Sequence, residues 1–264
     1  MNFKELGLSP KTIKAIDEFG ITEPTTVQSD VIPSILLGKD VFTIAPQRCG
    51  KTTSYVFPLI DIISKSKQKN ILIITPDSEQ SVVVSDRLAV FNKYHEINEA
   101  TIKDTNEDID NEANVIIGSP ELLVDLVNEN RIDLAKINIL VVDDINLIKK
   151  NKQLANLEKI LELLPAEKQN IIYTNRRSKE TQSILDKILK APEEIKVNKD
   201  KELEALPQTI TEPAKKKERT TTHKIKAPET PDKETLELIK KYNSFNGKPP
   251  HFLFNAGIIV PNEQ

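Results

Sequence analysis

Residues 41–52 have the sequence VFTIAPQRCGKT, in which a short apolar run leads directly into Gly50, Lys51 and Thr52. Successive apolar and β-branched residues are typical of a strand that is buried on both faces of a parallel sheet. Gly-Lys-Thr between such a strand and a helix is the pattern of a phosphate-binding loop, here with Ala45 at its first glycine position. In that pattern the loop N–H groups hold phosphates, the lysine reaches the β- and γ-phosphates, and the threonine hydroxyl binds Mg²⁺.

Strand and helix alternate in the same way over the first 200 residues. Four further apolar runs predict buried strands at 71–75, 115–118, 139–142 and 171–174. Helical spacing and helix-start signals predict helices at 10–19, 25–37, 51–65, 78–93, 120–129, 152–163 and 178–190. Because parallel strands are joined by right-handed helical crossovers, residues 1–198 are predicted to form a three-layer α/β domain around a parallel sheet.

Two acids, Asp143 and Asp144, follow the strand predicted at 139–142. An acid at the carboxyl end of a buried strand can hold a metal-bound water beside nucleotide phosphates. Solvated acids at an ordinary strand end are the alternative, but the phosphate-binding loop upstream favours the metal interpretation. We therefore expect Thr52 and Asp143 to bind Mg²⁺ together with ATP or ADP.

The composition of the whole chain excludes several classes of protein. The 264 residues include 37 Lys and Arg against 40 Asp and Glu, so the chain as a whole is not a basic nucleic-acid clamp. One cysteine excludes a disulfide framework and a thiolate metal cage, and three widely separated histidines indicate no metal site. No apolar run reaches the roughly 18 residues that a membrane span needs, and no apolar signal core is present, so we expect a cytoplasmic protein without a membrane partner.

The composition changes near residue 200. Residues 199–232 are rich in proline and charge and cannot bury enough apolar surface to fold, which predicts a flexible basic linker. Its basic side chains are concentrated in one cluster, which consists of Lys215, Lys216, Lys217, Arg219, Lys224 and Lys226. Two interpretations remain open for this cluster: a solvated linker, or an arm that contacts phosphates.

Residues 233–264 combine a stretch of helical spacing with an apolar segment that follows Pro249 and Pro250. Because the residue before a proline disfavours the helical conformation, the apolar segment is predicted to be extended, with Phe252 and Phe254 as its anchors. Two interpretations remain open here too. The segment folds back on its own domain, or it docks onto a protein partner.

Together with the N-terminal residues, the first domain resembles the N-terminal RecA-like lobe of DEAD-box RNA helicases. Residues 20–28, GITEPTTVQ, look like the Q motif of that family, and Phe3 lies 17 residues before this segment, as the family's aromatic residue does. The resemblance implies that Phe3 stacks on adenine and that Gln28, beside Thr25, hydrogen-bonds to the edge of the base. The alternative for Phe3 is an anchor that holds the first helix in the core.

The resemblance also assigns nucleotide contacts to the phosphate-binding loop and to the end of the strand predicted at 139–142. These positions are Ala45, Arg48, Gly50, Lys51, Thr52 and Asp143. Arg48 stands where the family has a glycine. It can crowd the pocket, add a positive charge to it, or point outward.

Residues 143–146, DDIN, stand in the place of the family's Asp-Glu-Ala-Asp box. In the family the second box residue orients the attacking water, and Asp144 is one methylene shorter there, a shift of about 1.5 Å. A displacement of about 1 Å can lower a rate about 10²-fold. Asn146 replaces an acid that communicates with the family's second lobe, so the sequence predicts degenerate catalysis.

Further departures fall on positions that face RNA in the family or couple its ATP state to RNA. Ser78 and Leu122 stand in the place of two arginines, and Tyr173 and Asn175 replace the hydroxyl residues that couple the ATP state to RNA. Residues 98–112 contain no counterpart of the family's Gly-Gly element. These changes predict that phosphate contacts are lost on that face.

The family hydrolyses ATP between two RecA-like lobes, and a second lobe needs about 150 residues. Only 67 residues follow Val197, so we expect no unwinding by this chain alone. Two functions remain open. The first is a non-unwinding module that binds ATP or ADP and RNA or a ribonucleoprotein. The alternative is an ATP-dependent RNA helicase or nucleotidase subunit that a second lobe completes in trans.

Overall fold

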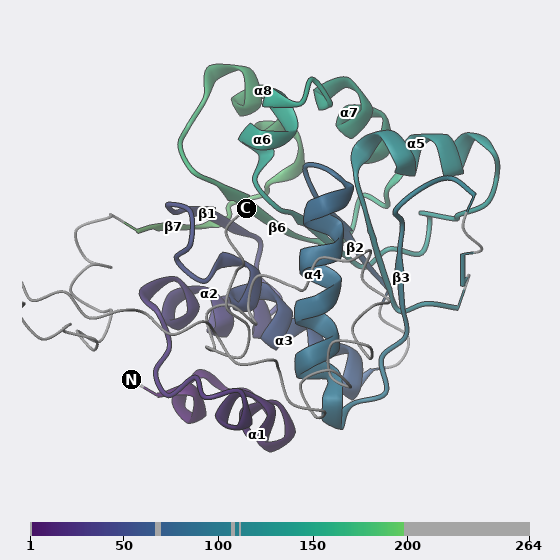
Figure 1. Cartoon of the computed structure of the whole chain (residues 1–264). Helices are drawn as coiled ribbons and strands as arrows, with labels where there is room; N and C mark the ends of the chain where they lie inside the picture. Colours follow the sequence, from purple (N-terminus) through teal and green to yellow (C-terminus); the bar gives the residue numbers. More distant parts are fainter. Residues whose placement is uncertain (1, 67–69, 107–108, 111, 198–264) are drawn as a thin grey trace, which may run out of the picture. The chain divides into compact units, whose positions relative to one another are not determined.

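The computed structural model describes residues 2–66, 70–106, 109–110 and 112–197, drawn in colour in Figure 1. The linker predicted at 199–232 and the docking segment predicted at 233–264 lie outside the described residues. The same holds for the binding residues predicted there, which are Lys215, Lys216, Lys217, Arg219, Lys224, Lys226, Phe252 and Phe254.

Seven parallel strands form one sheet in the order β3-β4-β2-β5-β6-β1-β7 (Figure 1). Their bounds are β1 (Val41–Ile44), β2 (Ile71–Ile74), β3 (Glu99–Thr101), β4 (Val115–Gly118), β5 (Ile139–Val142), β6 (Gln169–Thr174) and β7 (Glu193–Lys196). All five strands predicted from apolar runs are present, which confirms the α/β fold with a parallel sheet.

The two edge strands, β3 and β7, were not predicted. Their sequences are Glu-Ala-Thr and Glu-Glu-Ile-Lys, so neither forms an apolar run. Each pairs with a single neighbour, β3 with β4 and β7 with β1. An edge strand is solvated along one side and carries polar residues, and so the signal of a buried strand is missing.

The helices pack on both faces of the sheet (Figure 1). On one face lie α1 (Pro10–Glu18), α2 (Thr26–Leu36), α3 (Lys51–Lys65), α4 (Ser78–Phe91) and the short helices η1 (Phe3–Leu6) and η2 (Asn92–Tyr94). On the other lie α5 (Pro120–Asn128), α6 (Ile145–Lys150), α7 (Leu154–Leu163) and α8 (Lys179–Ile188). The seven predicted helices are present within about three residues at each end, and α6 was missed because it spans 6 residues.

Two apolar cores follow from the alternation of side chains along the strands. In β2, Ile71 and Ile73 point to the face of α2 and α3, whereas Leu72 and Ile74 point to the face of α5 and α7. All four are fully buried, and burial of such a side chain stabilises the fold by about 1.5–3 kcal/mol. The continuous apolar runs of the sequence are thus explained by burial on both faces of the sheet.

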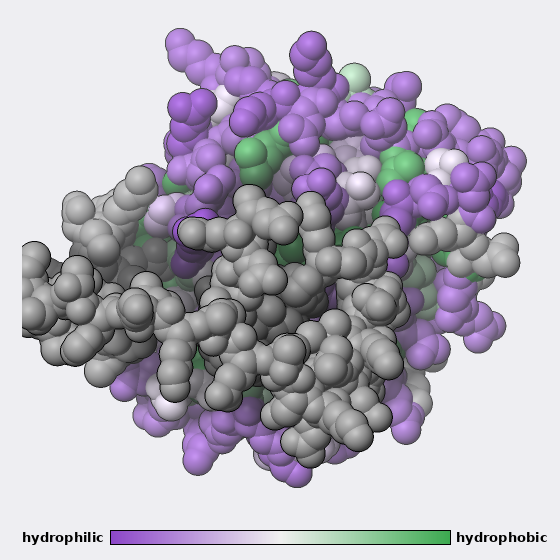
Figure 2. Space-filling model, viewed as in Figure 1, coloured by the Kyte–Doolittle hydropathy of each residue, from purple (hydrophilic) through white to green (hydrophobic). Residues whose placement is uncertain are grey.

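The surface is hydrophilic over most of the face shown in Figure 2, outside the parts drawn in grey. Single apolar side chains interrupt it. Among the described residues, Leu37 is an apolar side chain with 71% exposure. In the part of the chain that the structure describes, no helix has both the length and the apolar character of a membrane span.

The carboxyl ends of the parallel strands meet at one edge of the sheet, where ligands of open α/β sheets bind. The phosphate-binding loop leaves β1 at this edge, Asp143 follows β5, and Pro76 lies just beyond β2. β5 lies between β2 and β6, and β6 lies between β5 and β1. This order brings the predicted loop and the two acids to neighbouring positions.

Candidate functional site

The loop between β1 and α3 makes a tight turn. Ala45 is buried and its N–H donates to the Thr174 carbonyl at 2.9 Å, which ties the start of the loop to β6. Arg48 and Gly50 have φ angles of 64° and 84°, in the left-handed region. Glycine adopts this conformation without strain, whereas an arginine resists it. The loop therefore favours glycine at these two positions because of its backbone conformation, and Arg48 departs from that preference.

The N-terminus of α2 holds this loop in place. Thr25 Oγ1 donates to the Cys49 carbonyl at 3.0 Å, and Gln28 Nε2 donates to Thr53 Oγ1 at 2.7 Å. A Cβ atom on Gly50 would lie 3.0 Å from both Gln28 Nε2 and Thr25 Oγ1, tighter than most real Cβ contacts. Gly50 is thus required for the close approach of the two segments as well as for its φ angle.

Gln28 was expected to meet the edge of a base, and its position in the structure is different. Its side chain is buried, with 3% exposure, and its Oε1 accepts from the Thr25 N–H at 2.9 Å. Together with the bond from Nε2 to Thr53, both ends of the amide are used within the protein. In this arrangement Gln28 joins the start of α2 to the first turn of α3.

Lys51 and the two acids form the charged centre of the site. Lys51 Nζ lies 3.4 Å from Asp144 Oδ2, and the side chains of the pair are 10% and 5% exposed. Asp144 has a left-handed backbone with φ 60°, and its Oδ1 accepts from the Leu147 N–H at 3.4 Å as the N-cap of α6. Both Asp144 oxygens therefore have partners in this structure.

Asp143 is 4% exposed and lies beside the same lysine. Its Oδ2 accepts hydrogen bonds from Tyr55 Oη at 3.3 Å and Gln80 Nε2 at 3.2 Å. Burial raises the pKa of the Asp143 carboxyl above its usual range, while the Lys51 cation opposes this rise. Burial also raises the pKa of the Tyr55 phenol, so Tyr55 remains a neutral donor to this carboxyl.

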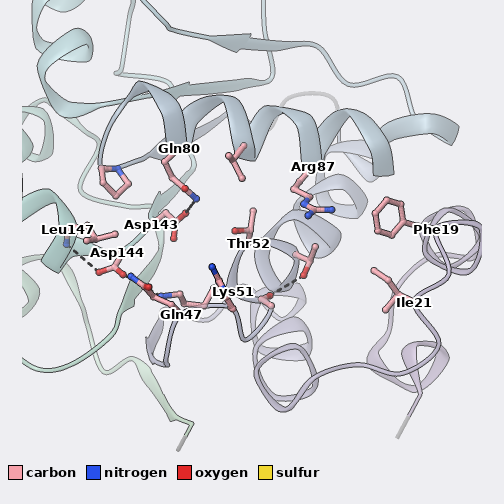
Figure 3. A pocket seen from close by; sticks show the side chains of 15 residues that line it. Phe19, Ile21, Gln47, Lys51, Thr52, Gln80, Arg87, Asp143, Asp144 and Leu147 are labelled. Atoms are coloured by element: carbon pink, nitrogen blue, oxygen red, sulfur yellow. Dashed lines mark hydrogen bonds and ion pairs between the residues drawn. The ribbon is translucent and has the colours of Figure 1, made fainter. Parts of the chain in front are cut away.

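A cavity of about 690 Å³ opens above these groups, and its two ends differ in chemistry (Figure 3). Around one end lie Gln47, Lys51, Asp143 and Asp144. At the other end, Phe19 and Ile21 approach from the loop after α1, and Arg87 approaches from α4. A charged end and an apolar end with one cation suit a molecule that has phosphates at one end and an aromatic base at the other.

Five of the predicted nucleotide contacts line this cavity, namely Arg48, Gly50, Lys51, Thr52 and Asp143, and so does Asp144, the predicted catalytic position. Among those the structure places elsewhere are Thr25, Gln28 and Ala45, which support the loop from behind. Arg48 is exposed at the rim of the cavity, where it adds positive charge.

Phe3 lies in the core, away from the lining of the cavity. It is 3% exposed, and its ring packs edge-on against Phe57 of α3 with the centroids 5.8 Å apart. Asn2 caps η1 in front of it through bonds to the Lys4 and Glu5 N–H groups. In the structure Phe3 therefore has the position of a core anchor, the alternative that its sequence left open.

Sequence reasoning missed several residues of the cavity, chiefly Phe19, Ile21, Gln80 and Arg87. The spacing from Gln80 through Val83 to Arg87 is three and four residues, which places them on one face of α4. Arg87 Cζ lies 5.7 Å from the centroid of the Phe19 ring, which is 47% exposed. The helical spacing on α4 can be recognised in the sequence. The contact between α4 and the loop after α1 cannot, because it depends on how the chain folds.

Asn146, two residues after Asp144, binds the end of β6. Its Nδ2 donates to Thr174 Oγ1 at 2.8 Å, to Asn175 Oδ1 at 3.0 Å and to the Arg176 carbonyl at 2.7 Å. The neighbouring Tyr173 is fully buried, with its Oη 2.8 Å from Ser54 Oγ on α3. Neutral side chains thus link the end of β6 to the first turn of α3, which follows the phosphate-binding loop.

The donor set fits a magnesium ion that arrives with a nucleotide. Mg²⁺ usually keeps several waters and is held by one or two carboxylates together with substrate phosphates. Thr52 and Asp143 offer a hydroxyl and a carboxylate on the same cavity. The described residues include no group of three or more acidic, histidine or cysteine side chains suited to a metal ion.

The positions of the two replaced arginines lie around a separate hollow of about 310 Å³ between the starts of α4 and α5. Ser78 and Leu122 line it, together with Asp77, Glu121 and Lys103. Glu121 Oε2 accepts from Gln153 Nε2 at 3.1 Å, and Asp77 Oδ1 caps α4 at the Gln80 N–H. An RNA phosphate here would meet two carboxylates and a single lysine among the described lining residues.

Comparison with known proteins places these observations in a family. The DEAD/DEAH box helicase model matches residues 25–182, more than half of the 264 residues. The DEAD-box ATP-dependent RNA helicase RhpA of Helicobacter pylori is 27% identical over 202 residues, which cover 74% of this chain and 41% of that protein. The helicase CshA of Geobacillus kaustophilus is 27% identical over 203 residues, with 74% and 43% covered. The chain thus spans about two fifths of the length of these relatives.

The fold agrees with a solved structure. A DEAD box protein from Methanococcus jannaschii superposes with a TM-score of 0.70 at 24% identity, over 75% of this chain and 56% of that one. This likeness shows that the parallel sheet and its two helical layers form a RecA-like domain. At this level of sequence identity, the two proteins are shown to share the fold alone.

Proposed function

This chain belongs to the DEAD/DEAH box helicase family, and from that premise we propose that it is a cytoplasmic module that binds ATP or ADP with Mg²⁺ and does not unwind RNA alone. The observation that carries the proposal is the convergence of Lys51, Thr52, Asp143 and Asp144 on one cavity. Around that cavity three cationic side chains, Arg48, Lys51 and Arg87, face two carboxylates. This charge balance favours an anionic ligand.

The phosphates would bind at the start of α3. The N-terminus of a 15-residue helix presents unpaired N–H groups and a partial positive charge, both of which favour phosphate. Lys51 is the first residue of this helix and would exchange its Asp144 partner for a phosphate oxygen. Thr52 and Asp143 would hold Mg²⁺, which neutralises phosphate charge when it is bound.

The base would lie at the other end of the cavity, on Phe19 and Ile21 and beside Arg87. An aromatic ring that is 47% exposed offers a stacking surface, and a guanidinium can lie against a π-system. Phe3 offers no such surface because its ring is covered. We therefore propose Phe19, in place of Phe3, as the residue that stacks on the base.

Replacing Phe19 with alanine is expected to weaken ADP binding about tenfold, because stacking of a base on an aromatic ring contributes about 1–3 kcal/mol. Replacing Phe3 with leucine is the matched control, since it removes a ring from the core and should lower stability while leaving the ADP affinity within about twofold. Fluorescence titration of a labelled ADP analogue and urea unfolding measure the two effects. A larger loss of affinity for Phe3→Leu than for Phe19→Ala would contradict this assignment.

RNA or a ribonucleoprotein is the proposed macromolecular partner, and the basic cluster at 215–226 is the proposed contact. The hollow between α4 and α5 offers little positive charge, so an RNA phosphate gains little there. The cluster has six basic side chains against one acid and can neutralise up to about five phosphates. Phe252 and Phe254 would then anchor the C-terminal segment on a protein partner.

Replacing the six basic residues of the cluster with glutamine in the full chain is expected to weaken single-stranded RNA binding and to flatten its salt dependence. Each phosphate contact contributes a slope of about −0.7 to the plot of log affinity against log salt, so the slope should change by up to about 3.5. A variant with glutamine at six exposed lysines of the first domain controls for the loss of charge alone; these are Lys4, Lys11, Lys159, Lys179, Lys187 and Lys190. Unchanged RNA affinity in the six-residue variant would exclude the cluster as the contact.

A second candidate is a helicase or nucleotidase subunit completed by another lobe in trans. It is favoured by the retention of Lys51, Thr52 and Asp143 around one cavity. The two candidates differ in one measurement. ATP turnover that appears only when a second protein is added would favour this alternative.

A further inference from the structure

The carboxylate of Asp143 is held by two side chains that take no part in the phosphate-binding loop pattern. Tyr55 Oη of α3 and Gln80 Nε2 of α4 donate to Asp143 Oδ2 at 3.3 Å and 3.2 Å. Figure 3 shows Gln80 extending from α4 toward Asp143, with the hydrogen bond drawn. Two helices and the end of β5 thus converge on a single oxygen atom.

Both bonds restrict the same degree of freedom, the rotation of the carboxylate about its bond to Cβ. Oδ2 has two lone-pair directions, which can serve the two donors, and neither donor binds Oδ1. Asp143 is 4% exposed and Tyr55 is fully buried, so the packing around the pair is fixed. The carboxylate is therefore held in one orientation, with Oδ1 left for another ligand.

We propose that Gln80 and Tyr55 are positioning residues for the Mg²⁺ ion that accompanies the nucleotide, acting by fixing the orientation of Asp143. The proposal rests on the proposed function, because it assumes that Asp143 meets a nucleotide-bound ion. Groups that orient a metal-binding carboxylate in this way typically change metal affinity 10–100-fold when they are removed. The metal dependence of nucleotide binding should therefore depend on both donors.

Gln80 is suited to a clean test because its side chain and its backbone have separate partners. Its N–H donates to Asp77 Oδ1 at 2.9 Å in the cap of α4, and this bond does not involve the side chain. Replacing Gln80 with methionine keeps the length of the side chain and removes the donor. Tyr55→Phe likewise removes only the hydroxyl group. Neither change alters the capping of α4 or the packing of the aromatic ring.

The experiment is a titration of a fluorescent ADP analogue with the full chain at graded free Mg²⁺ and in EDTA. For Gln80→Met we expect the Mg²⁺ concentration at half-maximal effect to rise about tenfold, a larger change than any change of the affinity in EDTA. Tyr55→Phe should shift it in the same direction. Gln182→Met is the control, because Gln182 donates to Asp186 at 2.7 Å in a similar bond on α8, outside the cavity.

An unchanged Mg²⁺ dependence in Gln80→Met, with intact ADP binding, would overturn this inference and leave the proposed function standing. Equal weakening in Mg²⁺ and in EDTA would also overturn it, because general damage to the pocket has that effect. If the unsubstituted chain binds no ADP, the proposed function and this inference both fail. A tenfold shift confined to the two donor variants supports the role of these residues.

Discussion

Replacing Lys51 with alanine is expected to lower nucleotide affinity by about 100-fold or more, the largest effect of any single substitution in the cavity. Removal of one partner from a buried charged contact costs about 2–5 kcal/mol, and about 2.7 kcal/mol corresponds to 100-fold. Lys51 is 10% exposed and lies beside both Asp143 and Asp144. Without it, phosphates would enter a site in which two buried carboxylates repel them.

The measurement is titration of the fluorescent ADP analogue in Mg²⁺, with circular dichroism to show that the variant is folded. Lys65→Ala is the matched control, since Lys65 lies in the last turn of the same helix and is exposed. It should bind as the unsubstituted chain does. An affinity within about threefold of the unsubstituted chain for Lys51→Ala would show that the nucleotide does not use the loop.

The second large effect concerns catalysis: we expect ATP turnover by this chain, with or without RNA, to equal that of Lys51→Ala. We propose that Asp144 stands in the place of the family's water-orienting residue. Its side chain is short, and both its oxygens have partners, Lys51 Nζ and the Leu147 N–H. Displacement of a catalytic group by about 1 Å lowers a rate about 10²-fold. To act on a water molecule, the carboxylate of Asp144 would have to break its contacts with Lys51 and with the N-cap of α6.

Phosphate release from ATP, measured with and without single-stranded RNA, tests this expectation. Lys51→Ala purified in the same way sets the background from contaminating enzymes. RNA-stimulated turnover that Lys51→Ala lacks would contradict the proposal of a non-unwinding module. Turnover restored only by a second protein would favour completion in trans.

The architecture could be predicted from the sequence wherever burial imposes a pattern. The strands from Val41, Ile71 and Ile139 are apolar at successive positions because helices cover both faces of the sheet. Two helix starts could be predicted because their capping hydrogen bonds join residues that are close in sequence. Ser9 caps the helix that begins at Pro10, and Thr25 and Gln28 cap the helix that begins at Thr26. β3 and β7 escaped prediction because pairing at an edge requires little apolar character.

The candidate site was predictable only in its local part. The loop around Lys51 and the acid after β5 follow from short segments, so their places on the cavity agree with the sequence pattern. Phe3 and Phe19 are both aromatic and both near the N-terminus, and only the packing on Phe57 separates a core residue from an exposed one. The bond from Gln80 to Asp143 joins residues 63 positions apart and has no local signal.

If this lobe retains a usable Mg²⁺-nucleotide site, calorimetric titration of the full chain with ADP and Mg²⁺ should detect it. The cavity, the loop and the paired charges predict saturable heat with a stoichiometry near one, reached at or below millimolar ADP and absent for Lys51→Ala. No binding heat at millimolar ADP in the presence of Mg²⁺ would contradict the claim. Crowding of the loop by the strained Arg48 would then be the first cause to examine, with Arg48→Gly as the variant.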